Sequence, residues 1–371
     1  MATLPTYQHL RVQQLSRVFE STTNSYKFYW FWSLLEQAQA HTVICFEELI
    51  LDMVALSWHT VAQYKLSLGM SDQLPIIIEQ LLQLGELKEY STRQEVKECL
   101  RDCSQKNNPS PAEKKVLQAL KDLQKYVPFR FISPFFSRIP EKRKNDSIAE
   151  QSRTQFAVAE KTAPYKINLK ASKKAIRSIT IHPQWQEYLQ LHHKILLEFC
   201  WWNFSQYLQS RNPNVPNINS KILPPNLLKR DLKTAKKFWK AVLTTASLPC
   251  LYTQQPLQAS WSIDHFVPWT FVLHDQLWNL LPTPNPINSS KSNTLPHFNY
   301  WEPFARLHYQ AVQVCPIPKL LEDYAILYRT PPTNLIHLPE EKFVQGLLEH
   351  LQPLMQQAHN LGFGEGWCWE G

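Results

Sequence analysis

Glycine is scarce in this chain and proline is abundant, with 7 glycines and 27 prolines among 371 residues. The tight turns of an all-β protein rely on glycine, whereas proline commonly stands where helices begin or end. The ratio therefore favours helices. At 371 residues the chain is long enough for about two or three cores, and a hydrophobic content of 44% is typical of a globular protein. We expect a mainly α protein (α+β), with helical N- and C-terminal regions around a small module of two strands and a helix.

Changes in composition and periodicity divide the chain into five expected segments. They are a helical N-terminal domain (1–126), a basic connector with a short strand (127–180), a helical region with a row of lysines (181–248), the small module (249–297) and C-terminal helices (298–371).

The second helix of the N-terminal domain begins after Thr23 or Asn24 and is aromatic on nearly every side. Its aromatic residues are Tyr26, Phe28, Tyr29, Trp30, Phe31 and Trp32. A helix that is apolar all round is usually buried, and a surface for docking a partner is the alternative. Further helices of this domain are expected at about 45–66, 74–86 and 92–104.

The connector begins with a short apolar stretch and continues as a polar segment from Arg138 to about Lys174. Its lysines could contact phosphates, although a charge-rich connector is usually only solvated. A strand is predicted at 175–181, followed by a long helix at 183–210.

A helix predicted from about Asn226 to Leu243 has an apolar stripe with lysines beside it at helical spacing. The lysine stripe consists of Lys229, Lys233, Lys236 and Lys240. Such a row can hold a nucleic-acid backbone, and an ordinary solvated face is the alternative. The formal net charge of +8 agrees with a polyanionic partner.

The seven cysteines are odd in number and include no Cys-x-x-Cys pair, so neither a disulfide framework nor a zinc site is indicated. Cys99 and Cys103 lie one helical turn apart and are expected to be buried thiols. The sequence shows no cleavable leader and no apolar run that could span a bilayer, so we expect a cytoplasmic protein without a membrane partner.

Residues 263–296 contain side chains that can carry out chemistry together. Asp264 and His265 come first, Asn279 follows an aromatic loop, and Asn288 and Lys291 lie one helical turn apart. Hydrolysis of a phosphodiester needs a base for the water and a cation for the leaving oxygen. His265 can take a proton near neutral pH, and Asp264 and Asn288 offer oxygen ligands that suit Mg²⁺ or Mn²⁺. The order predicts a one-metal phosphodiesterase.

Strand geometry limits how the first of these residues can be arranged. Successive side chains of a strand point to opposite faces, so Asp264 and His265 share a site only if the strand ends there. Pro268 agrees with such an ending. Asn279 lies in a short apolar run that predicts a second strand, and its amide could pin the loop carrying His265.

Pro286 predicts the start of a helix that follows these strands. Asn288 and Lys291 then share one face of this helix, with Lys291 expected near the phosphate. His274 and Asp275, in the intervening loop, could form a second ligand pair, although a polar loop dipeptide is more often solvated.

At these residues the sequence resembles the HNH endonuclease family, whose ββα-metal motif reads Asp-His-x-x-Pro, then Asn, then Asn (or His)-x-x-Lys. It looks most like the HNH nuclease domain of type II CRISPR effectors, because Cys250-Leu251-Tyr252-Thr253 resembles the Cys-x-Tyr-Thr-Gly hairpin of such domains. Gln254 replaces the glycine, which would alter the hairpin turn without touching a ligand. The resemblance covers about residues 249–297.

The resemblance implies that His265 is the general base, that Asp264 and Asn288 hold the metal, and that Asn279 supports the histidine, with Lys291 completing the catalytic set. It predicts a metal-dependent endonuclease that acts on DNA, with RNA left open as a substrate. Bacterial HNH proteins of this layout often serve in restriction or phage defence.

An alternative of another class is a nucleic-acid-binding or adaptor subunit whose HNH module is silent or activated by a partner. The intact Asp264, His265 and Asn288 argue against silence, because no binding role demands them. One HNH site cuts one strand, so a double-strand break would need a homodimer or sequential nicking.

Overall fold

The computed structural model describes residues 3–123, 127–135, 162–169, 176–257 and 260–370. It confirms a mainly α (α+β) fold, because helices predominate and the strands form two small antiparallel sheets. The chain divides into two compact units, residues 1–213 and 214–371. The helical region expected at 181–248 is therefore shared between the two units.

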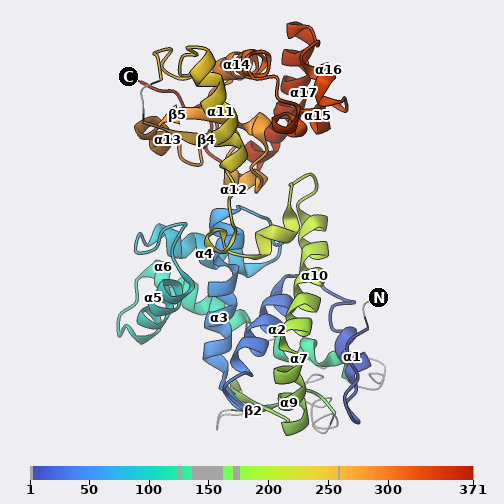
Figure 1. Ribbon diagram of the computed structural model, residues 1–371. Coiled ribbons are helices and arrows are strands. Elements are labelled where there is room, and N and C mark those ends of the chain that lie inside the picture. Colours follow the sequence, from blue (N-terminus) through green and yellow to red (C-terminus); the bar gives the residue numbers. More distant parts are fainter. Residues whose placement is uncertain (1–2, 124–126, 136–161, 170–175, 258–259, 371) are drawn as a thin grey trace. The chain divides into compact units, whose positions relative to one another are not determined.

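The first unit is built around three helices that run side by side (Figure 1). Its helices are α1 (Val12–Ser16), α2 (Tyr26–Gln37), α3 (Phe46–Trp58), α4 (Gln73–Gln83), α5 (Arg93–Gln105), α6 (Pro111–Leu123), α7 (Val127–Phe131), α9 (Pro183–Leu191) and α10 (His193–Arg211). Helix α2 packs against α3 on one side and α10 on another. Tyr29, Trp30 and Phe31 are 0% exposed, which confirms the buried helix and contradicts a docking surface.

A three-stranded antiparallel sheet closes this unit, in the order β1-β3-β2. Its strands are β1 (Val43–Cys45), β2 (Tyr165–Leu169) and β3 (Ile176–Ile181). Strand β3 confirms the predicted strand, and its Ile179 pairs with Ile44 on one side and Ile167 on the other. Strands β1 and β2 were not expected: β1 is very short, and β2 lies in the stretch assigned to the polar connector. Arg138 and the lysines that follow it lie outside the described residues.

Two further predictions for the first unit can be compared with the structure, one for a helix and one for two cysteines. The long helix expected at 183–210 is interrupted at His192, which separates α9 from α10. Cys99 and Cys103 are buried on α5, as expected, and the seven cysteines are free thiols.

The second unit surrounds a two-stranded antiparallel sheet with helices (Figure 1). The strands are β4 (Trp261–His265) and β5 (Leu280–Pro284). The helices are α11 (Lys233–Thr245), α12 (Trp269–Val272), α13 (Asn285–Lys291), α14 (Trp301–Val314), α15 (Glu322–Tyr328), α16 (Pro332–Leu335) and α17 (Glu340–Asn360). Trp239 of α11 donates its indole N–H to the Leu280 carbonyl at 2.8 Å, which joins α11 to the sheet.

The helix expected from Asn226 begins only at Lys233, which corrects the predicted lysine stripe. A short 3-10 turn at Pro225–Leu227 is followed by extended backbone at Leu228. The Asp231 carboxylate then accepts the Lys233 backbone N–H at 3.1 Å. Arg230 also stacks on Trp269, and the Asp231 N–H donates to Asp275. These tertiary contacts hold residues 230 and 231 in a non-helical conformation, so Lys229 lies outside α11.

The segment after α17 packs back onto the module instead of projecting from it. Trp367 donates its backbone N–H to the Leu295 carbonyl at 3.1 Å and accepts the His297 N–H at 2.9 Å. This segment therefore adds a short parallel bridge beside the residues that follow α13. No helix in the described part of the chain combines the length and apolarity needed to cross a membrane.

Candidate active site

The proposed catalytic residues come together where β4 ends and α13 begins. In the β4–β5 hairpin, Asp264 pairs with Leu281 and His265 with Leu280. The strand ends at His265, as predicted. The side chains of Asp264 and His265 therefore need not point to opposite faces of the sheet. Helix α13 follows β5 directly and packs against both strands, which brings Asn288 to β4.

Asp264 is buried and is held by two partners. Its Oδ1 accepts from the Lys291 ammonium at 3.0 Å, and its Oδ2 accepts from the Tyr252 hydroxyl at 2.9 Å. Asp264 is 3% exposed and Lys291 is 0% exposed. A buried carboxylate needs a paired cation or hydrogen bonds to stay ionised. Each oxygen keeps a lone pair that a cation could still use.

Lys291 does not lie where it was expected, near a substrate phosphate. Besides Asp264, its ammonium donates to the His265 carbonyl at 2.7 Å, and the whole side chain is enclosed. The helical spacing correctly placed Lys291 on the face shared with Asn288 but could not show that this face turns inward. The lysine therefore orients Asp264 and does not reach outward.

His265 is oriented by Asp275, a residue expected to be solvated. His265 Nε2 lies 2.9 Å from Asp275 Oδ1, and Asp275 Oδ2 accepts the Asp231 backbone N–H at 2.6 Å. Burial alone would raise the pKa of Asp275, but His265 and the Asp231 N–H outweigh it and lower the pKa. An ionised carboxylate can only accept, so Nε2 carries the proton and Nδ1 of neutral His265 keeps its lone pair.

The second interpretation of the loop, a His274-Asp275 ligand pair, is not supported. Asp275 is engaged with His265, and the His274 ring packs against Trp278 with centroids 5.2 Å apart. Burial lowers the pKa of His274 to about 4, so it is neutral at physiological pH. For His265 too, burial lowers the pKa and outweighs the opposing effect of Asp275.

Asn279 forms the loop contact that its position suggested. Its Oδ1 accepts the Val267 N–H at 2.8 Å, its Nδ2 donates to the Val267 carbonyl at 3.0 Å, and its own carbonyl accepts the Phe266 N–H at 2.9 Å. The residue is 0% exposed and ends a 3-10 turn just before β5. Three hydrogen bonds thus fix the backbone that leaves His265.

Asn288 presents its amide oxygen as a candidate ligand. Its Nδ2 donates to the Ser262 hydroxyl at 2.8 Å, and its Oδ1 has no hydrogen-bond partner among the described residues. The Asp264 carboxylate and this oxygen are hard donors, which fit Mg²⁺ or Mn²⁺. In the described part of the chain, no three His, Cys, Asp or Glu side chains converge as a metal cluster. Water and substrate oxygens would therefore have to complete the shell.

The hairpin before β4 keeps its turn although Gln254 replaces glycine. Gln254 adopts a left-handed conformation with φ 58°, and its N–H donates to the Cys250 carbonyl at 2.9 Å. This turn presents Tyr252, whose ring packs edge-on against Tyr300 and Trp367 at 5.1 and 5.0 Å between centroids. The contacts of Tyr252 with Asp264 and of Asp275 with His265 were not predicted from the sequence, where Asp275 was considered only as a possible ligand beside His274.

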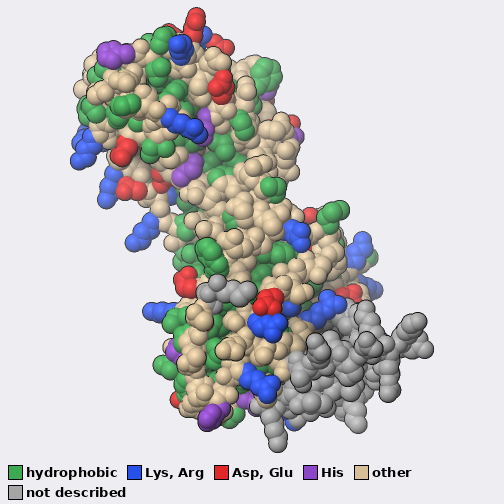
Figure 2. Space-filling model, turned by 90° about the vertical axis from the view of Figure 1, so that its right-hand side faces the viewer, with side chains coloured by type: hydrophobic (Ala, Val, Ile, Leu, Met, Phe, Trp, Pro, Cys, Tyr) green, Lys and Arg blue, Asp and Glu red, His purple; other side chains and the backbone are tan. Residues whose placement is uncertain are grey.

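The proposed nucleic-acid contacts remain accessible. Lys233, Lys236 and Lys240 are exposed on α11, and Lys229 is exposed on the segment before it. Figure 2 shows one face of this unit, where Lys and Arg side chains stand among acidic and apolar ones.

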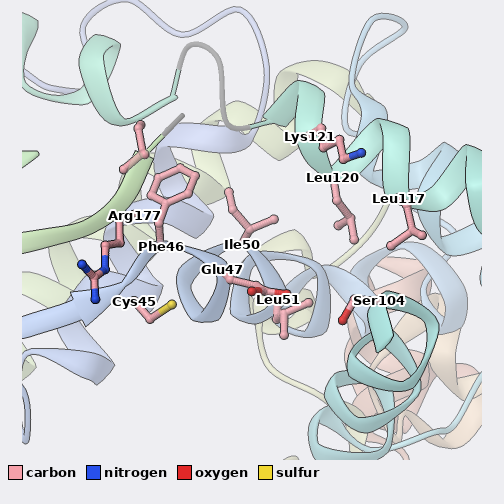
Figure 3. Close-up of a pocket in the computed structure, with 11 residues that line it drawn as sticks. Cys45, Phe46, Glu47, Ile50, Leu51, Ser104, Leu117, Leu120, Lys121 and Arg177 are labelled. Carbon is pink, nitrogen blue, oxygen red and sulfur yellow. The ribbon is translucent and has the colours of Figure 1, made fainter. Parts of the chain in front are cut away.

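The first unit contains a cavity of a different kind. It measures about 380 Å³, and side chains of α3 and α6 face each other across it (Figure 3). Phe46, Ile50 and Leu120 give it an apolar floor, with Lys121 and Arg177 at its sides. Its lining carries no histidine and no pair of carboxylates suited to hydrolysis, so the chemistry is assigned to the second unit.

Comparison with known proteins agrees with the geometry of the second unit. Residues 250–297 match the family model described as HNH endonuclease. This segment is an HNH endonuclease module, as its motif indicated. The closer resemblance to type II CRISPR effectors stays a prediction. The chain has no significant match among curated proteins or among solved structures.

The contacts of Asn279 predict a large effect of its removal. Asn279→Ala leaves the buried N–H and carbonyl of Val267 without partners and should destabilise the second unit by about 2 kcal/mol or more. Hydrogen exchange at the Val267 amide should accelerate as well. Asn285→Ala, which removes an exposed amide from the same module, is the control and should change neither. Equal stability of the two variants in denaturant titrations would contradict this account of Asn279.

Proposed function

We propose that this protein is a metal-dependent endonuclease that hydrolyses DNA phosphodiester bonds. One observation carries the proposal: Asp275 holds His265 by Nε2 and leaves Nδ1 available, while Asp264 and Asn288 supply oxygen donors from β4 and the α13 packed against it. The match to HNH endonucleases supports nuclease activity. The choice of metal, DNA as the substrate and a role in bacterial restriction or phage defence rest on the motif resemblance and on chemistry.

The residues of the site suit hydrolysis by one activated water. Nδ1 of His265 takes a proton from the water, and Asp275 stabilises the imidazolium that forms. Asp264 and the Asn288 oxygen would hold Mg²⁺ or Mn²⁺, which neutralises charge on the phosphate and on the leaving oxygen. Lys291 and Tyr252 fix the Asp264 carboxylate, and Asn279 fixes the loop after His265.

The exposed lysines supply the proposed contact with the nucleic-acid backbone. Lys233, Lys236 and Lys240 share α11, whose Trp239 is bonded to β5. Contacts with phosphates give affinity without reading sequence. We therefore assign these lysines, with Lys229, to holding DNA beside the site.

The first prediction from this proposal concerns the base, because removing a general base typically costs about 10²–10⁴ in rate. Purified protein should nick supercoiled plasmid with Mg²⁺ or Mn²⁺ and not with EDTA, and RNA should be tested in parallel. His265→Ala should bind the plasmid and lose this nicking. His337→Ala, at an exposed histidine of the same unit, is the control and should cut normally.

Undiminished nicking by His265→Ala would refute the assignment of the base. Metal-independent binding without nicking by the wild-type protein would favour the silent or partner-activated module.

The second prediction concerns the lysines. Changing Lys229, Lys233, Lys236 and Lys240 together to Gln should weaken DNA binding equally for unrelated sequences. It should also flatten the dependence of log K on log salt, by about 0.9 for each phosphate that the variant no longer neutralises. The control changes four other exposed lysines, Lys114, Lys115, Lys319 and Lys342. If both quadruple variants show the wild-type slope, the lysines are only a solvated surface.

The third prediction separates a ligand from a bystander at Asn288. Asn288→Ala should lose nicking with every metal, because the oxygen donor is gone. Asn288→His should keep part of the activity and shift its preference from Mg²⁺ toward Mn²⁺, Co²⁺ or Ni²⁺, since imidazole suits these ions better. Plasmid nicking over a metal series measures this, with circular dichroism to confirm folding. A folded Asn288→Ala that cuts like the wild type with Mg²⁺ would show that Asn288 is not a ligand.

A further inference from the structure

The proposed reaction needs a cation that reaches the substrate phosphate, and two buried lysines of the second unit cannot supply it. Lys291 and Lys221 are both 0% exposed. Lys291 donates to Asp264 and the His265 carbonyl, and Lys221 donates to the Thr270 carbonyl at 3.2 Å. Both lysine side chains are buried and bonded to protein acceptors, so neither can reach a substrate phosphate.

Arg230 differs from these lysines. It is exposed, and the contact that holds it in place does not use its N–H donors. Its guanidinium lies over the Trp269 ring, with Cζ 4.1 Å from the ring centroid. Stacking uses the face of the guanidinium and leaves the N–H groups in its plane available. Arg230 has no hydrogen bond and no ion pair within 4.0 Å to a described residue.

The backbone around Arg230 is fixed to the catalytic histidine. The next residue, Asp231, donates its N–H to Asp275 at 2.6 Å, and Asp275 in turn binds His265. Trp269, the ring under Arg230, comes four residues after His265 and is 6% exposed. Two independent contacts therefore place the arginine beside the proposed base.

Electrostatics agree with this placement. The Arg230 charge lowers the pKa of both His265 and Asp275, although burial is the largest influence on each. Partial burial lowers the pKa of Arg230 itself, and Asp275 opposes that shift. A guanidinium remains charged at neutral pH, so Arg230 places a full positive charge with unpaired donors close enough to influence His265 and Asp275.

The nearby carboxylates limit where an anion can bind. Asp231, Asp275 and Asp323 line a cavity of about 380 Å³ beside Trp269, so an anion is not expected inside it. Each of them accepts a backbone N–H, at 2.6 to 3.1 Å, which reduces its repulsion. The favourable position is at the exposed edge of Arg230, where Lys229 precedes it and Lys233 follows.

We propose that Arg230 binds the scissile phosphate of the nucleic acid and is a catalytic residue of this site. The inference rests on the proposed nuclease function and deepens it. The planar guanidinium can offer two parallel N–H donors to two phosphate oxygens, which orients the phosphorus toward the water activated by His265. Lys229, Lys233 and the other α11 lysines then hold the strand on the approach to Arg230.

The test compares Arg230→Gln and Arg230→Lys with the wild type, with Arg306→Gln as the control. Arg306 is an arginine on α14 paired with Glu302 and Glu340. Two quantities are measured: the slope of log K against log salt for binding to a DNA duplex in EDTA, and the single-turnover nicking rate in Mg²⁺. Thermal unfolding confirms that each variant is folded.

Arg230→Gln should reduce the magnitude of the salt slope by about 0.9, the value for a single neutralised phosphate. It should also lower the nicking rate by about 10²-fold, as when one preorganised donor is removed from a transition state. Arg230→Lys should keep the wild-type slope, because the charge remains, and recover only part of the rate, because the paired donors are gone. Arg306→Gln should leave both unchanged.

An unchanged slope in Arg230→Gln would overturn the proposal, even with slow nicking, because the arginine would then only position Asp275. A reduced slope with normal nicking would also overturn it, since Arg230 would contact a phosphate that is not cut. If the wild type binds DNA but never nicks it, the nuclease function fails. The slope then decides separately whether Arg230 touches a phosphate.

Discussion

The buried ion pair between Asp264 and Lys291 is the interaction on which the arrangement of this site depends. It joins the end of β4 to the last turn of α13, the two elements that carry the proposed metal ligands. Breaking such a pair leaves an uncompensated charge in the interior, which typically costs about 3–5 kcal/mol. Although Asp264 is only 3% exposed, both of its carboxylate oxygens have donors, from Lys291 and Tyr252.

A second chain of contacts sets the properties of the base. The Asp231 N–H binds Asp275, and Asp275 binds His265, so a segment far from the motif in sequence determines which imidazole nitrogen is free. This orientation exists before any substrate arrives. Preorganised groups of this kind need no rearrangement during the reaction, which is the usual source of a large catalytic effect.

Much of the site could be predicted from the sequence because its residues lie close together along the chain, at the ends of short elements. The strand that ends at His265, the helix that begins near Pro286 and the position of Asn279 follow from spacing and from the residues that begin and end elements. Periodicity could not show that Lys291 turns inward, because a helix face carries no sign of what covers it. The role of Asp275 depends on a partner ten residues away, across a loop.

Two elements of the fold differ from the prediction, each for its own physical reason. Helix α11 was expected from Asn226, but contacts of Arg230 with Trp269 and of Asp231 with Asp275 hold the preceding residues in a non-helical conformation. Strand β2 was missed because only Tyr165 and Ile167 of its residues are buried, which is a weak alternation within a polar stretch. The helices predicted at about 74–86 and 92–104, in contrast, agree with α4 and α5, since their burial pattern extends over several turns.

The packing of Trp367 has a consequence for the size of the catalytic unit. This residue lies some seventy positions beyond the HNH match, yet its ring contacts Tyr252, which holds Asp264. Trp239 and Asp231 support the same module from the other side in sequence. An excised 250–297 peptide would keep the reactive side chains but lose the contacts with Trp367, Trp239 and Asp231 that position them. The HNH motif therefore specifies the reactive side chains, while the rest of this unit supplies the contacts that position them.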